Sequence, residues 1–186
     1  MFIQTESTPN PATLKFLPGR DVMGGGAVAD FPSREAAQRS PLARALFETP
    51  DVSRVFFGSD FISVTKTGGD WKHLKPAILG AIMEHFTRGL PLIEEGAEEA
   101  DETVSDDNDS EIVLQIKDLI ETRVRPAVAQ DGGDIIFKGF DDKAGIVFLH
   151  MRGSCAGCPS STMTLKNGIE NMLRHYIPEV NAVEAV

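Results

Sequence analysis

Cysteine is scarce in this sequence. The 186 residues include two cysteines, Cys155 and Cys158, both in the run GSCAGCPSST at 153–162. Two cysteines in a chain of this length exclude the disulfide framework that holds small secreted domains together. Long apolar runs are also absent, since none approaches the roughly 18 residues of a membrane-spanning helix. We therefore expect a protein of a reducing compartment that has no membrane partner.

The N-terminal run MFIQTESTPNP lacks three features of targeting segments. It has no basic region, no long apolar region and no series of arginines, which argues against a signal peptide and a mitochondrial transit peptide. The expected location is the cytoplasm of a bacterium or, for a mature chain already trimmed, the mitochondrial matrix.

Basic charge is also in deficit, because the formal net charge is −10. This excess of acid argues against binding to nucleic acid. Nearly all of it lies in residues 94–110, EEGAEEADETVSDDNDS, which carry nine acidic residues and no basic one. Such a stretch buries little apolar surface and repels itself, so it is predicted to be a solvated flexible linker. An acidic docking segment for a basic partner is the alternative.

The half of the chain before the linker, residues 1–93, alternates strand and helix patterns. The expected elements are a strand at 13–19, a helix at 33–48 broken at Pro41, a hairpin at 52–66 and a helix at 71–89. The face that the last helix should bury consists of Leu74, Ile78, Ile82 and Phe86. Together these elements predict a small α+β domain.

The half after the linker, residues 111–186, predicts a second α+β domain. A helix starts near Glu111 and closes at Pro126, two strands meet at the Asp141–Gly145 turn, and a helix starts at Pro159. A short last strand is expected near the C-terminus. The buried stripe of the Pro159 helix should contain Leu165, Ile169, Met172, Leu173 and Tyr176. The fold class is thus α+β, with two small domains joined by an acidic flexible linker.

The two cysteines lie between a predicted strand and the start of a helix. Free amides and the positive end of the helix dipole should be close to both sulfurs, and Arg152 adds positive charge. These features favour the thiolate form of Cys155 and Cys158, which binds metal or attacks a disulfide. By spacing alone, a C-x-x-C pair fits thiol redox chemistry, zinc binding or iron–sulfur binding.

A single chain has too few ligands for a metal site built from cysteines. A structural zinc or an iron–sulfur cluster needs about four, and no third cysteine exists. His150 and His175 are the nearest candidates for mixed ligation, but packing or exposed positions are expected for both. The remaining solution is a dimer in which each chain supplies one C-x-x-C pair.

Several runs resemble one known family. GSCAGCPSSTMTLKNGIE at 153–170 and RPAVAQDGGDIIF at 125–137 are similar to the signature of the NifU C-terminal domain. The runs at 1–19, 40–47 and 55–66 resemble the domain that precedes NifU-like modules in Nfu-type proteins. The resemblance covers nearly the whole chain except the linker.

The resemblance implies an iron–sulfur cluster scaffold and carrier, not an enzyme. Cys155 and Cys158 would bind a [4Fe–4S] cluster between the two chains of a homodimer; four thiolates also accept a [2Fe–2S] cluster. The chain would receive the cluster from upstream assembly proteins and transfer it to apo iron–sulfur proteins. A dithiol–disulfide oxidoreductase and a structural zinc-bridged dimer are the alternatives.

Three further features have simpler interpretations. The run Asp131–Asp134, DGGD, is expected to be a turn that sets up the next strand, with a role in shaping the cluster loop as the alternative. Gly24–Gly26 lacks the spacing of a phosphate-binding loop and should be a flexible loop. Lys166 would either neutralise cluster charge or lie on a solvated helix face.

Overall fold

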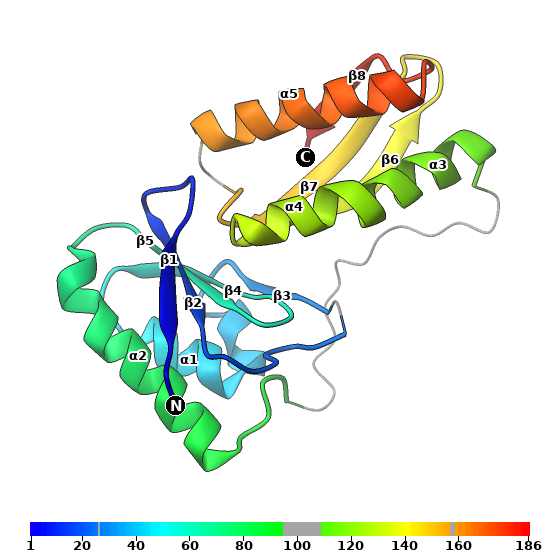
Figure 1. Cartoon of the computed structure of the whole chain (residues 1–186). Coiled ribbons are helices and arrows are strands. Elements are labelled where there is room, and N and C mark those ends of the chain that lie inside the picture. Colours follow the sequence, from blue (N-terminus) through cyan, green and yellow to red (C-terminus); the bar gives the residue numbers. More distant parts are fainter. Residues whose placement is uncertain (26, 95–108, 157–158) are drawn as a thin grey trace. The chain divides into compact units, whose positions relative to one another are not determined.

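The computed structural model describes residues 1–25, 27–94, 109–156 and 159–186, with backbone only for 159–162. The chain divides into two compact units, Met1–Glu99 and Ala100–Val186. Each combines helices with a β-sheet, so the predicted α+β class is confirmed (Figure 1). Residues 95–108 lie outside the described residues. The linker and the domain bounds 1–93, 94–110 and 111–186 therefore stay predictions.

The described part of the N-terminal unit contains a five-stranded antiparallel sheet with the order β1-β2-β5-β4-β3. Its strands are β1 (Gln4–Ser7), β2 (Thr13–Leu17), β3 (Ala29–Phe31), β4 (Val52–Phe57) and β5 (Ile62–Lys66). The strand predicted at 13–19 and the hairpin at 52–66 are confirmed. The two edge strands, β1 and β3, were not predicted.

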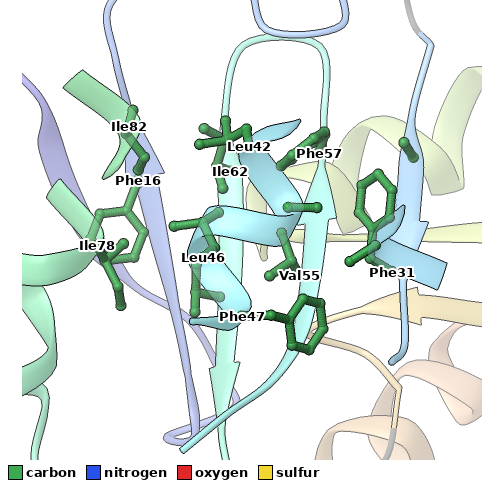
Figure 2. Close-up of a cluster of buried hydrophobic side chains, with 14 of the residues drawn as sticks. Phe16, Phe31, Leu42, Leu46, Phe47, Val55, Phe57, Ile62, Ile78 and Ile82 are labelled. Carbon is green, nitrogen blue, oxygen red and sulfur yellow. The ribbon is translucent and has the colours of Figure 1, made fainter. Parts of the chain in front are cut away.

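Helices pack on one face of this sheet. They are the 3-10 turn η1 (Ala36–Arg39), α1 (Pro41–Phe47) and α2 (Trp71–Arg88). The break at Pro41 is confirmed, because Pro41 opens α1 and the Ser40 hydroxyl caps it by accepting from Ala43 N at 3.1 Å. Figure 2 shows Leu42 and Leu46 of α1 over the strands, and Ile78 and Ile82 of α2 beside Phe16.

The predicted core face of α2 is confirmed, and it also includes a histidine. Leu74, Ile78 and Ile82 are buried, Phe86 is half-buried and packs against the same core, and His85 is buried as well. At 3.6 residues per turn, a step of three and a step of four both return to the same face. The step of three therefore brings His85 to the buried face of α2 as well.

The C-terminal unit is a helical run, a hairpin, a helix and a last strand. Its elements are α3 (Glu111–Leu119), η2 (Ile120–Val124), α4 (Arg125–Gln130), β6 (Gly133–Asp141), β7 (Ile146–Gly153), α5 (Pro159–Tyr176) and β8 (Ala182–Ala185). Strands β6 and β7 are antiparallel, and β8 pairs with β7 in parallel. The hairpin, the helix at Pro159 and the final strand are confirmed.

The helix predicted to close at Pro126 instead continues to Gln130. Proline clashes with the carbonyl four residues before it and lacks an N–H. The run accommodates Pro126 by widening into a π-turn, in which Arg125 N donates to Ile120 O five residues back. The prediction is wrong because this local widening lets the chain remain helical through the proline.

The core of the C-terminal unit lies between its helices and one face of the sheet. Alternate residues of β7, namely Val147, Leu149 and Met151, pack there with Ile169 and Leu173 of α5. The predicted core position Tyr176 is wrong, since its side chain is 48% exposed and Ile177 is buried instead. Within the described ranges, no helix is long and apolar enough to cross a membrane.

Candidate metal centre

Cys155 lies in a tight turn between β7 and α5. The turn is closed by a hydrogen bond from Ala156 N to Gly153 O at 3.2 Å, and Gly153 has the positive φ of +63° that such a reversal requires. Cys155 is 5% exposed and belongs to the hydrophobic core of the unit. Cys158, the other predicted ligand, lies outside the described residues, so its role stays a prediction.

The DGGD run contacts the cysteine turn directly. Asp131 and Gly132 form the turn after α4, and β6 begins at Gly133 beside Gly153 of β7. A methyl group added at Gly133 would lie 2.7 Å from Cys155 Sγ and 2.8 Å from the carbonyl oxygen of Arg152. The run is therefore the predicted turn. It also adjoins the cysteine, and the alternative, a role in shaping the cluster loop, stays a prediction.

Ser154 ties the cysteine turn to the DGGD run. Its backbone N–H donates to Gly132 O at 3.2 Å, and its hydroxyl donates to Asp131 O. The same hydroxyl oxygen is 4.0 Å from Cys155 Sγ. Two consecutive carbonyls of one turn thus hold the residue that immediately precedes the predicted ligand.

A buried ion pair holds the other end of the DGGD run. Arg125 Nε and one of its terminal nitrogens donate to the two carboxylate oxygens of Asp134, at 2.9 and 3.1 Å. The other terminal nitrogen contacts Glu121 at 2.8 Å. The hydrogen bonds to Asp134 raise the pKa of Arg125 further above its ordinary value, although burial opposes them. The backbone N–H of this arginine also donates to Ile120 O and so closes the π-turn before Pro126.

The predicted contribution of Arg152 is not tested by these contacts. Arg152 lies opposite Asp134 in the β6–β7 pairing, one residue before Gly153. The expected preference of the cysteines for the thiolate form stays a prediction.

The two histidines considered as additional ligands have other neighbours. His150 Nδ1 lies 2.9 Å from the carbonyl oxygen of Val186, and the exposed ring of His175 meets Tyr176 edge-on at 5.1 Å. Among the described residues, no group of three or more His, Cys, Asp or Glu side chains could hold a metal ion. Lys166 pairs with Glu184 at 3.6 Å, and its action on a cluster stays a prediction.

Sequence reasoning missed Arg125 and Ser154 as residues that support the cysteine turn. Arg125 is nine residues from Asp134 in sequence and at the opposite end of a helix-to-strand reversal. The opposite charges of Arg125 and Asp134 are evident in the sequence, but their pairing depends on the geometry of the turn between them. Ser154 sits directly beside the cysteine, yet its hydrogen bonds reach residues 22 and 23 positions earlier in the chain.

Two family models match the chain. Residues 3–89 match the model described as the N-terminal domain of the scaffold protein Nfu/NifU. Residues 116–184 match the NifU-like domain. The matches fall on the N-terminal and C-terminal units in the same order as the resemblance predicted.

Similar proteins share both parts. A Drosophila virilis protein described as mitochondrial NFU1 iron–sulfur cluster scaffold homolog is 54% identical over the whole of this chain, which covers 62% of that protein. A Drosophila ananassae protein of the same description is 52% identical, with 64% covered. The chain thus spans less than two thirds of these relatives. A solution structure of a NifU-like protein from Saccharomyces cerevisiae matches 51% of this chain and 86% of its own, with 25% identity and a TM-score of 0.44.

Proposed function

The chain belongs to the Nfu-type proteins, which join an Nfu N-terminal domain to a NifU-like domain, and from this we propose that it is an iron–sulfur cluster scaffold and carrier. Two copies would bind one [4Fe–4S] cluster, each supplying Cys155 and Cys158. A [2Fe–2S] cluster has the same ligand requirement. The cluster is cargo, to be released to another protein.

The observation that carries this proposal is the position of Cys155 in the matched NifU-like domain. Its turn follows the end of β7 and lies against the DGGD turn, four residues before α5 begins at Pro159. Soft thiolates are the ligands that iron–sulfur clusters take from proteins. The chain has two cysteines, half the required number, which supports sharing of the cluster across a two-fold axis.

Transfer to an apo-protein would proceed by ligand substitution. A thiolate of the recipient forms a bond to a cluster iron while the bond from that iron to Cys155 or Cys158 breaks. The released cysteine leaves as a thiolate and takes up a proton from water. No electrons pass in this exchange, so neither an oxidant nor a reductant is needed. A recipient that offers four ligands of its own holds the cluster more firmly than an interface between two chains, which gives the exchange its direction.

The descriptions of the relatives favour one of the two expected locations. Their descriptions say mitochondrial, which supports the mitochondrial matrix form of the two expected locations and gives no support to the cytoplasmic one. Apo iron–sulfur proteins would be recipients, and upstream assembly proteins would be donors. The homodimer would form when the cluster binds.

Anaerobic reconstitution with iron and sulfide tests the proposal. We expect about four irons per two chains, a Mössbauer spectrum of a [4Fe–4S] cluster, and a dimer on size exclusion that weakens when the cluster is removed. Cys155→Ser and Cys158→Ser should each abolish cluster binding. His150→Ala and His175→Ala are the controls and should bind the cluster normally.

Three results would contradict the carrier. Stoichiometric zinc that iron does not displace would indicate a structural zinc dimer. Full thiol-exchange activity without metal would indicate an oxidoreductase. A cluster-loaded protein that elutes as a monomer would exclude ligands shared between two chains.

A further inference from the structure

The space that holds the sulfur of Cys155 exists because residue 133 has no side chain. A Cβ atom at Gly133 would lie 2.7 Å from the sulfur and 3.3 Å from the backbone nitrogen of Cys155. Non-bonded heavy atoms attract best at about 3.5–4.0 Å, so an added carbon this close to the sulfur would be repelled. The sulfur therefore fills the position in which any other residue would place its side chain.

The walls of this space have little freedom to move. One wall is the carbonyl oxygen of Arg152, which would lie 2.8 Å from the added carbon and belongs to the backbone of β7. The cysteine turn is held by the two hydrogen bonds of Ser154, which is 2% exposed. The Gly132 backbone, with φ of +81°, bonds back to Ala129 O at 3.0 Å.

We propose that Gly133 and Ser154 are positioning residues for Cys155. We call these two residues together the sulfur seat. Gly133 supplies the space for the sulfur, and Ser154 fastens the turn that carries it to the DGGD run. This inference rests on the proposed function, since the seat matters because Cys155 is a ligand. A sulfur placed before the cluster arrives loses less conformational freedom on binding, so the seat slows release of the cargo.

Another glycine of the same strand provides a matched control. Gly139 lies on β6, and a Cβ there would meet nothing within 4 Å. Neither Gly133 nor Gly139 has a positive φ, so alanine suits the backbone at both. Gly133→Ala and Gly139→Ala thus add the same methyl group to one strand, beside the sulfur in one case and into open space in the other.

The seat can be tested without iron. The reduced, metal-free full chain is treated with iodoacetamide under native conditions, and the label on Cys155 is followed by peptide mass spectrometry. A buried thiol reacts through its opened state, so its rate reports how often the seat opens. Overpacking of this kind should raise the Gly133→Ala rate by about tenfold or more. Ser154→Ala should raise it severalfold, and Gly139→Ala should leave it unchanged.

The same variants separate positioning from a general loss of stability. Urea titrations give the free energy of global unfolding of each variant, and from it the labelling rate that global unfolding alone would cause. The proposal requires that Gly133→Ala react faster than this calculated rate. Equal rates for the two alanine variants, or an increase that unfolding fully explains, would overturn the seat.

A second measurement connects the seat to the cargo. In the reconstituted protein, Gly133→Ala should lose iron to a chelator severalfold faster than Gly139→Ala. Equal loss would overturn the role of the seat in retaining the cluster. The labelling experiment uses metal-free protein, so a negative result there would overturn the seat and leave the proposed carrier function standing. Failure of wild-type reconstitution would refute the carrier and leave the labelling result intact.

Discussion

The ion pair between Arg125 and Asp134 gives the sharpest stability prediction. Asp134 is 3% exposed and accepts two hydrogen bonds from one guanidinium group. Asp134→Asn keeps the shape but removes the charge, and the amide nitrogen then faces an N–H donor of Arg125. Residue 134 then offers the guanidinium one acceptor where it had offered two.

The magnitude follows from how deeply each partner is buried. Removing one partner of a fully buried ion pair costs about 3–5 kcal/mol. The Arg125 side chain is 24% exposed and retains Glu121, which softens the loss, and we expect about 2 kcal/mol. Because 1 kcal/mol shifts the melting temperature of a domain of this size by about 4–8 °C, the transition should fall by about 8–16 °C.

The chain contains an internal control for this measurement. The single tryptophan, Trp71, opens α2 in the N-terminal unit, so its fluorescence follows that unit, while far-UV circular dichroism follows both. Asp134→Asn should shift the transition seen by circular dichroism and leave the Trp71 transition in place. Glu121→Gln removes an exposed i,i+4 partner and should cost about 0.5 kcal/mol or less. Equal melting temperatures for Asp134→Asn and Glu121→Gln would refute the assignment of this buried pair as a main support of the turn.

Two other predictions concern a buried histidine and a turn glycine. Burial lowers the pKa of His85 below 6.5, so the unfolded chain binds the proton more readily, and the N-terminal unit should lose stability as pH falls below about 6.5, by at most about 1.4 kcal/mol per pH unit. His85→Phe should flatten this pH dependence of the unfolding free energy in urea titrations followed by Trp71 fluorescence. The control, substitution of the exposed His73 by Gln, should leave it unchanged. Equal pH dependence in wild type and both variants would contradict burial of His85 as the cause. Gly145 has φ of +69°, and a Cβ added there would lie 2.5 Å from Asn181 Nδ2 and 2.6 Å from Glu179 O. Gly145→Ala should therefore destabilise the C-terminal unit by more than about 1 kcal/mol. An unchanged melting temperature by circular dichroism would show that this turn relaxes freely.

Elements with strong periodicity could be predicted from sequence. The hairpin of β4 and β5, the helix α2 and the elements from β7 to β8 follow apolar spacing, caps and turn residues that act within a few positions. The edge strands β1 and β3 are three or four residues long. Runs this short show too few alternations to be distinguished from loop, and their pairing depends on the neighbouring strand.

The errors have the same origin. Pro126 predicts the end of a helix under local rules, but packing of Ile120, Val124 and Val128 in the core stabilises the run through a π-turn. Tyr176 continues the apolar spacing of α5, yet its ring meets Arg123 and stays half exposed. In both cases the sequence pattern is sound, and a contact distant in sequence decides the outcome.

The α+β class, the C-x-x-C spacing and the shortage of cysteine ligands in one chain could be predicted from the sequence, because they follow from periodicity and from counting residues. Three contacts could not be predicted in this way: Gly133 leaves the space for the Cys155 sulfur, Ser154 donates to the DGGD turn, and Arg125 pairs with Asp134. Each of these contacts forms when β6 and β7 pair in one register and the helical run reverses onto them. Contacts between segments that are distant in sequence form only in the folded chain, and the residues that make them have no local sequence pattern from which the contact could be predicted.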